Sequence, residues 1–138
     1  MNLKFFEKNH VQLHSIFRIA VGLLFFQHGG QKLFGWFGGN AVELMNLFAF
    51  NMSSLFVLAG LIEFFGGLFI AAGFFTRVSA LFGIFDMIGA FFIGHVSNGW
   101  IPIINKGELA LLYLVAFLVI LSYGPGKWAL DKVFFKRN

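Results

Sequence analysis

Residues 54–75, SLFVLAGLIEFFGGLFIAAGFF, decide the fold class of this chain. Glu63 is the only charged residue in the segment, which is long enough to cross the hydrocarbon core of a bilayer as one α-helix. Small residues, which let the backbones of membrane helices approach closely, recur along it: Gly60, Gly66, Gly67, Ala71, Ala72 and Gly73. We therefore predict a transmembrane helix that packs tightly against a second helix.

The composition of the whole chain indicates a membrane protein. Of its 138 residues, 59% are hydrophobic, 20% are aromatic and only 12% are charged. A soluble core of this size cannot bury so much apolar surface, so the excess must face lipid. The chain has no cysteine, which excludes disulfides, thiolate metal sites and CxxC redox motifs. Redox chemistry would therefore need a bound cofactor or a partner.

Three more segments are predicted to span the membrane: residues 13–33, 78–95 and 107–123. No small-x-small cleavage site follows the first, which favours a retained helix over a signal peptide. Thr76-Arg77 is a minimal turn that makes the second and third spans antiparallel. Apolar residues at helical spacing beside Glu43 and Asn46 predict a short interfacial helix after the first span. The expected fold is all-α, a polytopic membrane four-helix bundle in a single domain, residues 1–138.

The basic residues predict the orientation of this bundle. Seven lie on the side of the termini: Lys4, Lys8, Arg77, Lys127, Lys132, Lys136 and Arg137. Only Lys32 and Lys106 lie on the other side. Because cytoplasmic loops carry an excess of Lys and Arg, both termini are predicted to be cytoplasmic in a multi-pass protein of the bacterial inner membrane. Basic residues at the ends of apolar runs are topology signals, so nucleic-acid binding is not predicted despite the net charge of +4.

Three charged residues fall near the middle of the predicted spans. Arg18 lies roughly 15 Å from His28, and Glu63 and Asp86 each lie roughly 13 Å from the outer ends of their helices, at about 1.5 Å rise per residue. Charges at this depth are costly and should face the bundle interior. Arg18 can neutralise one acid, which leaves the other carboxyl protonated. The predicted cluster of Arg18, Glu63 and Asp86 is either an interhelical structural contact or a proton-accepting group at the base of a cavity.

A second set of polar residues lies at the outer ends of the spans. Lys32 and Glu108 are at matching depth and are predicted to pair. His28, Lys32 and Tyr113, surrounded by Phe side chains, are suited to hold a quinone head group, because its carbonyl oxygens need donors inside an apolar pocket. The predicted ligand-binding residues are His28, Lys32, Glu63, Glu108 and Tyr113.

The two outer histidines have other interpretations. His28 and His95 could each be an interfacial residue bonded to a loop carbonyl. They could also ligate a haem iron from opposite sides, but nothing beyond their number supports haem. No metal site is predicted.

The chain resembles the DoxX family of small bacterial four-helix membrane proteins in motifs that run in order over nearly its whole length: Arg18-Ile-Ala-Val-Gly22, His28-Gly29-x-Gln31-Lys32-Leu33-Phe34-Gly35, Ala59-Gly60-Leu61-x-Glu63-x-x-Gly66-Gly67, Gly73-x-x-Thr76-Arg77, Asn105-x-Gly107-Glu108 and Gly124-Pro125-Gly126-x-x-x-x-Asp131. The family includes proteins that look like membrane subunits of quinone-linked oxidoreductases. The resemblance implies an inner-membrane protein with a redox role, in which a partner supplies the thiol or the flavin.

Two functions follow as hypotheses. The first is an accessory subunit of a membrane redox system that binds a quinone or another small apolar molecule. The alternative is a non-enzymatic membrane protein, either a small-solute or proton pathway or a scaffold for partner proteins. The sequence leaves open whether the chain has catalytic activity, which redox partner it has and whether it forms a homo-oligomer.

Overall fold

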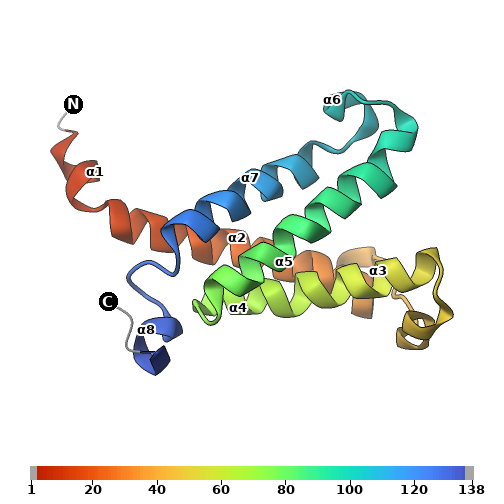
Figure 1. Cartoon of the computed structure of the whole chain (residues 1–138), viewed down its shortest axis with the longest axis horizontal. Coiled ribbons are helices and arrows are strands. Elements are labelled where there is room, and N and C mark those ends of the chain that lie inside the picture. The colour runs from red at the N-terminus through yellow and green to blue at the C-terminus, as the bar shows by residue number, and fades with distance from the viewer. Residues whose placement is uncertain (1–2, 136–138) are drawn as a thin grey trace.

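The computed structural model describes residues 3–135, and most of this range is helical, with no β-strand among these residues (Figure 1). The first long helix is α2. Three consecutive elements form the second, and three more form the third, which ends in a single 3-10 turn. The fourth long helix is α7. Their bounds are α2 His10–Phe34; α3 Met52–Leu61, η3 Ile62–Gly66 and α4 Gly67–Ala72; α5 Thr76–Gly89, η4 Ala90–His95 and η5 Val96–Asn98; and α7 Glu108–Tyr123.

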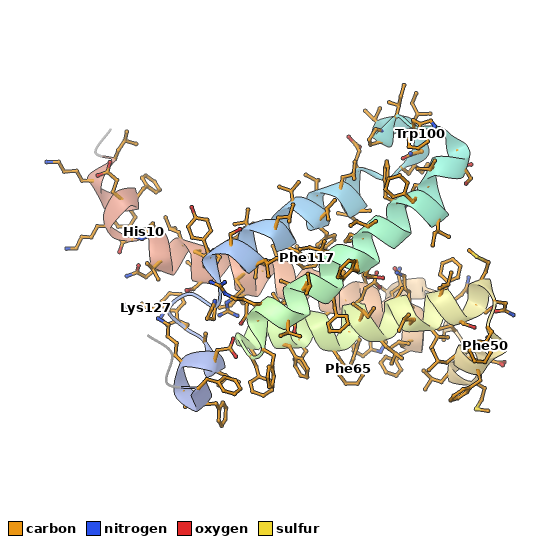
Figure 2. The ribbon with its side chains drawn as sticks, in the orientation of Figure 1. His10, Phe50, Phe65, Trp100, Phe117 and Lys127 are labelled. Carbon is orange, nitrogen blue, oxygen red and sulfur yellow. The ribbon has the colours of Figure 1, made fainter. Side chains whose placement is uncertain are left out.

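Short helices lie at the two ends of the molecule. They are α1 Lys4–Lys8, η1 Trp36–Gly38, η2 Leu44–Ala49, α6 Pro102–Asn105 and α8 Leu130–Phe135. Figure 1 places α1 and α8 at one end, called the terminal end here, and α6 with the start of α3 at the other, called the loop end. Phe50 and Trp100 mark the loop end in Figure 2.

The long helices form two side-by-side pairs. The first helix packs along the second, and α5 packs along α7. Gly35, with a φ of +71°, ends the first helix, because glycine adopts the left-handed conformation without a steric cost. The segment between α4 and α5 is short, as Thr76-Arg77 predicted, but the turn itself is formed by Gly73–Phe75. Toward the loop end, α3 and the third helix diverge (Figure 1).

The first and second helices touch backbone to backbone. A Cβ atom added to Gly67 would lie 2.3 Å from the Phe26 nitrogen, and one added to Gly29 would lie 2.2 Å from the Phe64 nitrogen. At Gly22 the same atom would lie 2.4 Å from the Ala71 nitrogen. These contacts confirm the close approach predicted from the small residues of the second span.

Apolar side chains fill the interior between the two ends. Phe25 and Phe117 are fully buried, and their ring centroids are 4.7 Å apart in an edge-to-face contact. Figure 2 shows Phe117 between the helices and Phe65, which is 49% exposed, pointing away from them. Val21, Ile70, Ile84 and Ile120 belong to the same core.

Most apolar residues of the long helices nevertheless point outward. Met52–Ala72 and Thr76–Asn98 are long and apolar enough to cross a membrane, yet only 28% and 33% of their most apolar windows are buried. An apolar surface of this extent suits a lipid environment. The α7 helix has 16 residues and is about 24 Å long. It is therefore shorter than the hydrocarbon core of a typical bilayer, which is about 30 Å thick.

The predicted element ranges agree with the observed helices to within a few residues. The short helix after the first span is present as the 3-10 helix η2. Two predicted irregular segments contain helices instead, α6 in the loop before α7 and α8 in the basic tail. Lys136 and Arg137, used in the orientation argument, lie outside the described residues.

The backbone contact at Gly67 gives a test of this packing. We expect Gly67→Ala to lower the free energy of unfolding by about 1–3 kcal/mol, because the added methyl group overpacks the interface. Gly89→Ala is the matched control, since its Cβ meets nothing within 4 Å, and should stabilise its helix by up to about 1 kcal/mol. Thermal unfolding in detergent measures both, and equal stabilisation by the two substitutions would contradict the contact.

Candidate functional site

An ion pair joins the first two helices near the loop end. The Lys32 ammonium donates a hydrogen bond of 2.5 Å to Oε1 of Glu63. Glu63 is only 3% exposed, whereas the side chain of Lys32 is 31% exposed. A buried carboxylate needs such a partner because charge is costly away from water. The predicted pairing of Lys32 with Glu108 is wrong: Lys32 points to the second helix, and Glu108 is an exposed residue in the first turn of α7.

Two further polar residues lie around this pair, on the third and fourth helices. Asp86 interacts electrostatically with both Glu63 and Lys32, and Tyr113 interacts with Glu63. Oε2 of Glu63 and Oδ2 of Asp86 are both buried and have no hydrogen-bond partner. Buried polar atoms without partners are uncommon in native structures, so this group has unused capacity to accept hydrogen bonds.

His28 lies beside the same group, one helical turn before Lys32. Its ring meets the Tyr113 ring edge to face, with centroids 5.7 Å apart, and Tyr113 is 8% exposed. Lys32 is close enough to interact with His28 electrostatically. The structure therefore brings together four of the five predicted ligand-binding residues: His28, Lys32, Glu63 and Tyr113.

A cavity of about 260 Å³ adjoins the ion pair. It lies between the second and third helices where they diverge. Lys32 and Asp86 are the two charged residues in its wall, and the other lining residues are apolar or small: Met52, Leu55, Phe56, Leu58, Ala59, Ile62, Phe85, Gly89, Ala90, Ile93 and Gly94. His28, Tyr113 and Glu63 are not part of this wall.

Both helices that form the cavity change their hydrogen-bond pattern beside it. Ile62–Gly66, which includes Glu63, and Ala90–His95 are π-helical segments within otherwise α-helical spans. Such segments are rare and are frequent at functional sites. The sequence contains no periodicity that reveals them.

Small residues of the third helix line the cavity instead of packing against a helix. Ala90 and Gly94 are spaced as a small-xxx-small pair, a pattern that predicts close helix contact. A Cβ added to Gly94, or to the neighbouring Gly89, meets nothing within 4 Å. The position of the cavity was not predicted from the sequence, because small residues at helical spacing are found both at close helix contacts and beside cavities.

Arg18 belongs to a different cluster, at the terminal end. Its guanidinium donates hydrogen bonds to the carbonyl oxygens of Ile70, Ala71 and Trp128, and Arg18 is fully buried. The first two carbonyls are in the last turn of α4, where such groups lack intrahelical partners and carry partial negative charge. Arg18 therefore stabilises the end of a helix.

Asp131 completes this terminal cluster and was absent from the predicted sites. Its carboxylate accepts hydrogen bonds from the backbone nitrogens of Phe75, at 2.7 Å, and Thr76, at 3.0 Å. Both N–H groups lie at the start of α5, where negative charge is favourable. Asp131 also attracts Arg18. The signal in the sequence was the Gly124-Pro125-Gly126-x4-Asp131 motif, which had been used only as a mark of resemblance.

The predicted cluster of Arg18 with Glu63 and Asp86 is therefore wrong. Gly29 contacts Phe64 and Gly22 contacts Ala71, so Glu63 is level with the end of α2 while Arg18 is level with the end of α4. The depth of Arg18 was counted from His28, whereas both the predicted span and α2 end five to six residues later, at 33 and at Phe34, so Arg18 lies closer to the terminal end than that depth implied. The two carboxyls do interact electrostatically, without the guanidinium.

His95 lies near the loop end, where it is the last residue of η4. Nδ1 of His95 lies 3.0 Å from the carbonyl oxygen of Asn105, which agrees with the interpretation of a histidine bonded to a loop. Within residues 3–135, no group of three or more metal-ligating side chains is present.

The sequence matches a known family model and several known proteins. The DoxX family model matches residues 13–96. A protein of Haemophilus influenzae whose function is uncharacterised is 35% identical, over 95% of this chain and 97% of its own length. The inner membrane protein YqjF of Escherichia coli is 32% identical, over 87% of this chain and 90% of its own. An uncharacterised membrane protein of Mycobacterium tuberculosis is 28% identical, over 87% and 80% respectively. No solved structure matches.

The ion pair can be tested with a double-mutant cycle. Lys32→Met leaves the Glu63 carboxylate buried without a partner, and we expect a loss of about 2 kcal/mol in the free energy of unfolding, below the 3–5 kcal/mol of fully buried pairs because Lys32 is partly exposed. Lys32→Met combined with Glu63→Gln should recover at least about 1 kcal/mol of that loss. Additive effects in detergent unfolding curves would show that the pair is not coupled.

The role of Arg18 predicts a different result. Arg18→Lys should lower the free energy of unfolding by about 2 kcal/mol or more. The guanidinium donates to three carbonyls through its planar, forked set of N–H groups, and the ammonium of lysine lacks this geometry. Arg77→Lys is the control, since Arg77 is exposed and makes one contact of 3.3 Å with the Ser122 carbonyl. If both variants unfold like the wild type, Arg18 does not stabilise the end of α4.

Proposed function

The chain belongs to the DoxX family of membrane proteins, and from this premise we propose that it is an accessory subunit of a membrane redox system that binds a quinone-type ligand in the cavity between its second and third helices. The observation that carries this proposal is the cavity itself, an apolar space with Lys32 and Asp86 at its polar side. Pockets for small ligands commonly combine apolar walls with a few polar groups that fix the orientation.

The size of the cavity supports a ring rather than a whole lipid. Its volume of about 260 Å³ is just below the range of roughly 300–1,000 Å³ for ligand sites. A single head group would occupy it, and an isoprenoid tail would remain in the bilayer. Several wall residues are exposed on the outer surface, among them Phe56 at 51% and Phe85 at 62%, so a ligand dissolved in lipid has direct access.

We propose that all four long helices cross the inner membrane, with the termini in the cytoplasm. The even number of long helices and the placement of α1 and α8 at the same end support this arrangement (Figure 1). The short α7 helix would then need flanking residues or local thinning of the bilayer to cover the hydrocarbon core. The cavity would open to the outer half of the membrane.

The role of an accessory subunit follows from what the chain lacks. It has no cysteine, so it supplies no thiol of its own to exchange electrons with the ligand. A partner protein would supply the flavin or thiol. A continuous proton pathway is less favoured, because the core residues between Asp86 and the terminal cluster, including Ala80, Ile84 and Phe117, are apolar.

Filling the cavity tests this function. In Gly89→Leu, the new side chain would enter the cavity without striking the backbone, and we expect it to weaken binding of short-tailed ubiquinone and menaquinone analogues at least about tenfold, or 1.4 kcal/mol. Ala20→Leu, at an exposed position of α2 outside the cavity, is the control and should bind like the wild type. Equilibrium binding in nanodiscs, corrected with empty discs, measures both.

Co-purification gives a second readout of the same proposal. Mass spectrometry of the wild-type protein extracted with native lipid should detect a quinone or quinol in excess of the lipid background, and Gly89→Leu should remove the excess. Binding that is equal in all variants, or absent from all, would overturn the proposal.

A further inference from the structure

The polar side of the cavity offers both hydrogen-bond donors and an acceptor. The Lys32 ammonium has three N–H groups, and one of them is used by Oε1 of Glu63. Asp86 lines the same cavity; its Oδ2 is covered by protein and has no donor, so a ligand would meet its Oδ1. Within residues 3–135, the ion pair that Lys32 forms is with Glu63. Lys32 and Asp86 do not form an ion pair with each other, although they interact electrostatically.

A ligand that satisfies both residues must accept a hydrogen bond from Lys32 and donate one to Asp86. A hydroxyl oxygen can accept a hydrogen bond from one group while its O–H donates to another. A carbonyl oxygen can accept from Lys32 but brings no hydrogen to Asp86. Leaving a buried carboxyl without a partner is costly, so a carbonyl ligand forfeits part of the binding free energy that a hydroxyl ligand gains.

We propose that this cavity recognises an aromatic hydroxyl group, held between Lys32 as donor and Asp86 as acceptor. The inference rests on the proposed function for the location of the ligand and adds its chemical form. Between the two members of a quinone-type pair, the reduced member, which carries hydroxyl groups, binds more tightly than the oxidised member, which carries carbonyls.

The other polar groups nearby do not replace Asp86 in this role. Glu63 is bonded to Lys32 through Oε1, and it lies outside the cavity wall. His28 and Tyr113 face each other ring to edge, also outside the wall. Asp86 is therefore the acceptor that a ligand in the cavity would meet, and Lys32 is the donor.

The test compares two probes with the same ring system and no redox chemistry. The hydroxyl of 1-naphthol can donate a hydrogen bond, whereas 1-methoxynaphthalene has a methyl group in place of that hydrogen. Binding to the full chain in phosphatidylcholine nanodiscs is measured for each, with empty discs subtracted to remove partitioning into lipid. We expect the naphthol to bind about tenfold more tightly or better, as for a hydrogen bond to a charged group.

Asp86→Asn is the diagnostic variant. It keeps the size of the side chain, leaves the Lys32–Glu63 pair in place and replaces one acceptor oxygen with an NH₂ group that only donates, so we expect the ratio of the two affinities to fall at least threefold. Gly89→Leu should weaken both probes, and Ala20→Leu should leave both affinities and their ratio unchanged.

The outcomes separate the two proposals. If both probes bind equally to the wild type and Gly89→Leu weakens both, the cavity binds ligands but hydroxyl recognition is overturned. If the naphthol preference persists unchanged in Asp86→Asn, the assignment of Asp86 is overturned. If neither probe binds above the empty discs, or Gly89→Leu has no effect, the proposed function fails together with this inference.

Discussion

The direct contact between the backbones of the first and second helices is the constraint on which the candidate site depends. Lipid gives no hydrophobic driving force for helices to associate, so close packing and interhelical polar contacts must supply it. Gly22, Gly29 and Gly67 allow that contact, and any side chain at these positions would overlap the facing backbone. The contact also sets which residues are level with one another. Lys32 reaches Glu63 because Gly29 and Phe64 meet one turn away.

The two polar clusters differ in what surrounds them. In the terminal cluster, Arg18 donates to three carbonyls and Asp131 accepts from two backbone nitrogens, although Nε of Arg18 and Oγ1 of Thr76 have no partner. These bonds join the end of α4, the start of α5 and the segment before α8. At the loop end, one oxygen of Glu63 and one of Asp86 lack donors beside a cavity. Within the described part of the chain, each cluster therefore keeps two buried polar atoms without a partner, and the loop-end cluster is the one whose residues Lys32 and Asp86 line a cavity.

The helices were predictable from the sequence, and their relative positions were not. Long apolar runs and the Thr76-Arg77 turn located the helices within a few residues, because the length of an apolar segment is a property of that segment alone. The pairing of charges depends on the offset between two helices. That offset follows from the backbone contacts at glycines and from where α2 ends, at Phe34. Lys32 and Glu63 were therefore recognised as site residues but assigned to the wrong partners, Glu108 and Arg18. The π-helical segments and Asp131 left no periodic signal to read.

Two sets of glycines inside the long helices have different physical reasons. A glycine inside a helix costs about 0.8–1 kcal/mol relative to alanine. At Gly22, Gly29 and Gly67 the close packing of two helices offsets that cost, since no other residue fits. At Gly89 and Gly94 nothing lies within 4 Å of a would-be Cβ, so packing gives no compensation there. Both residues line the cavity that Lys32 and Asp86 share. The absence of side chains at these two positions keeps this volume open beside the unsatisfied carboxyl of Asp86.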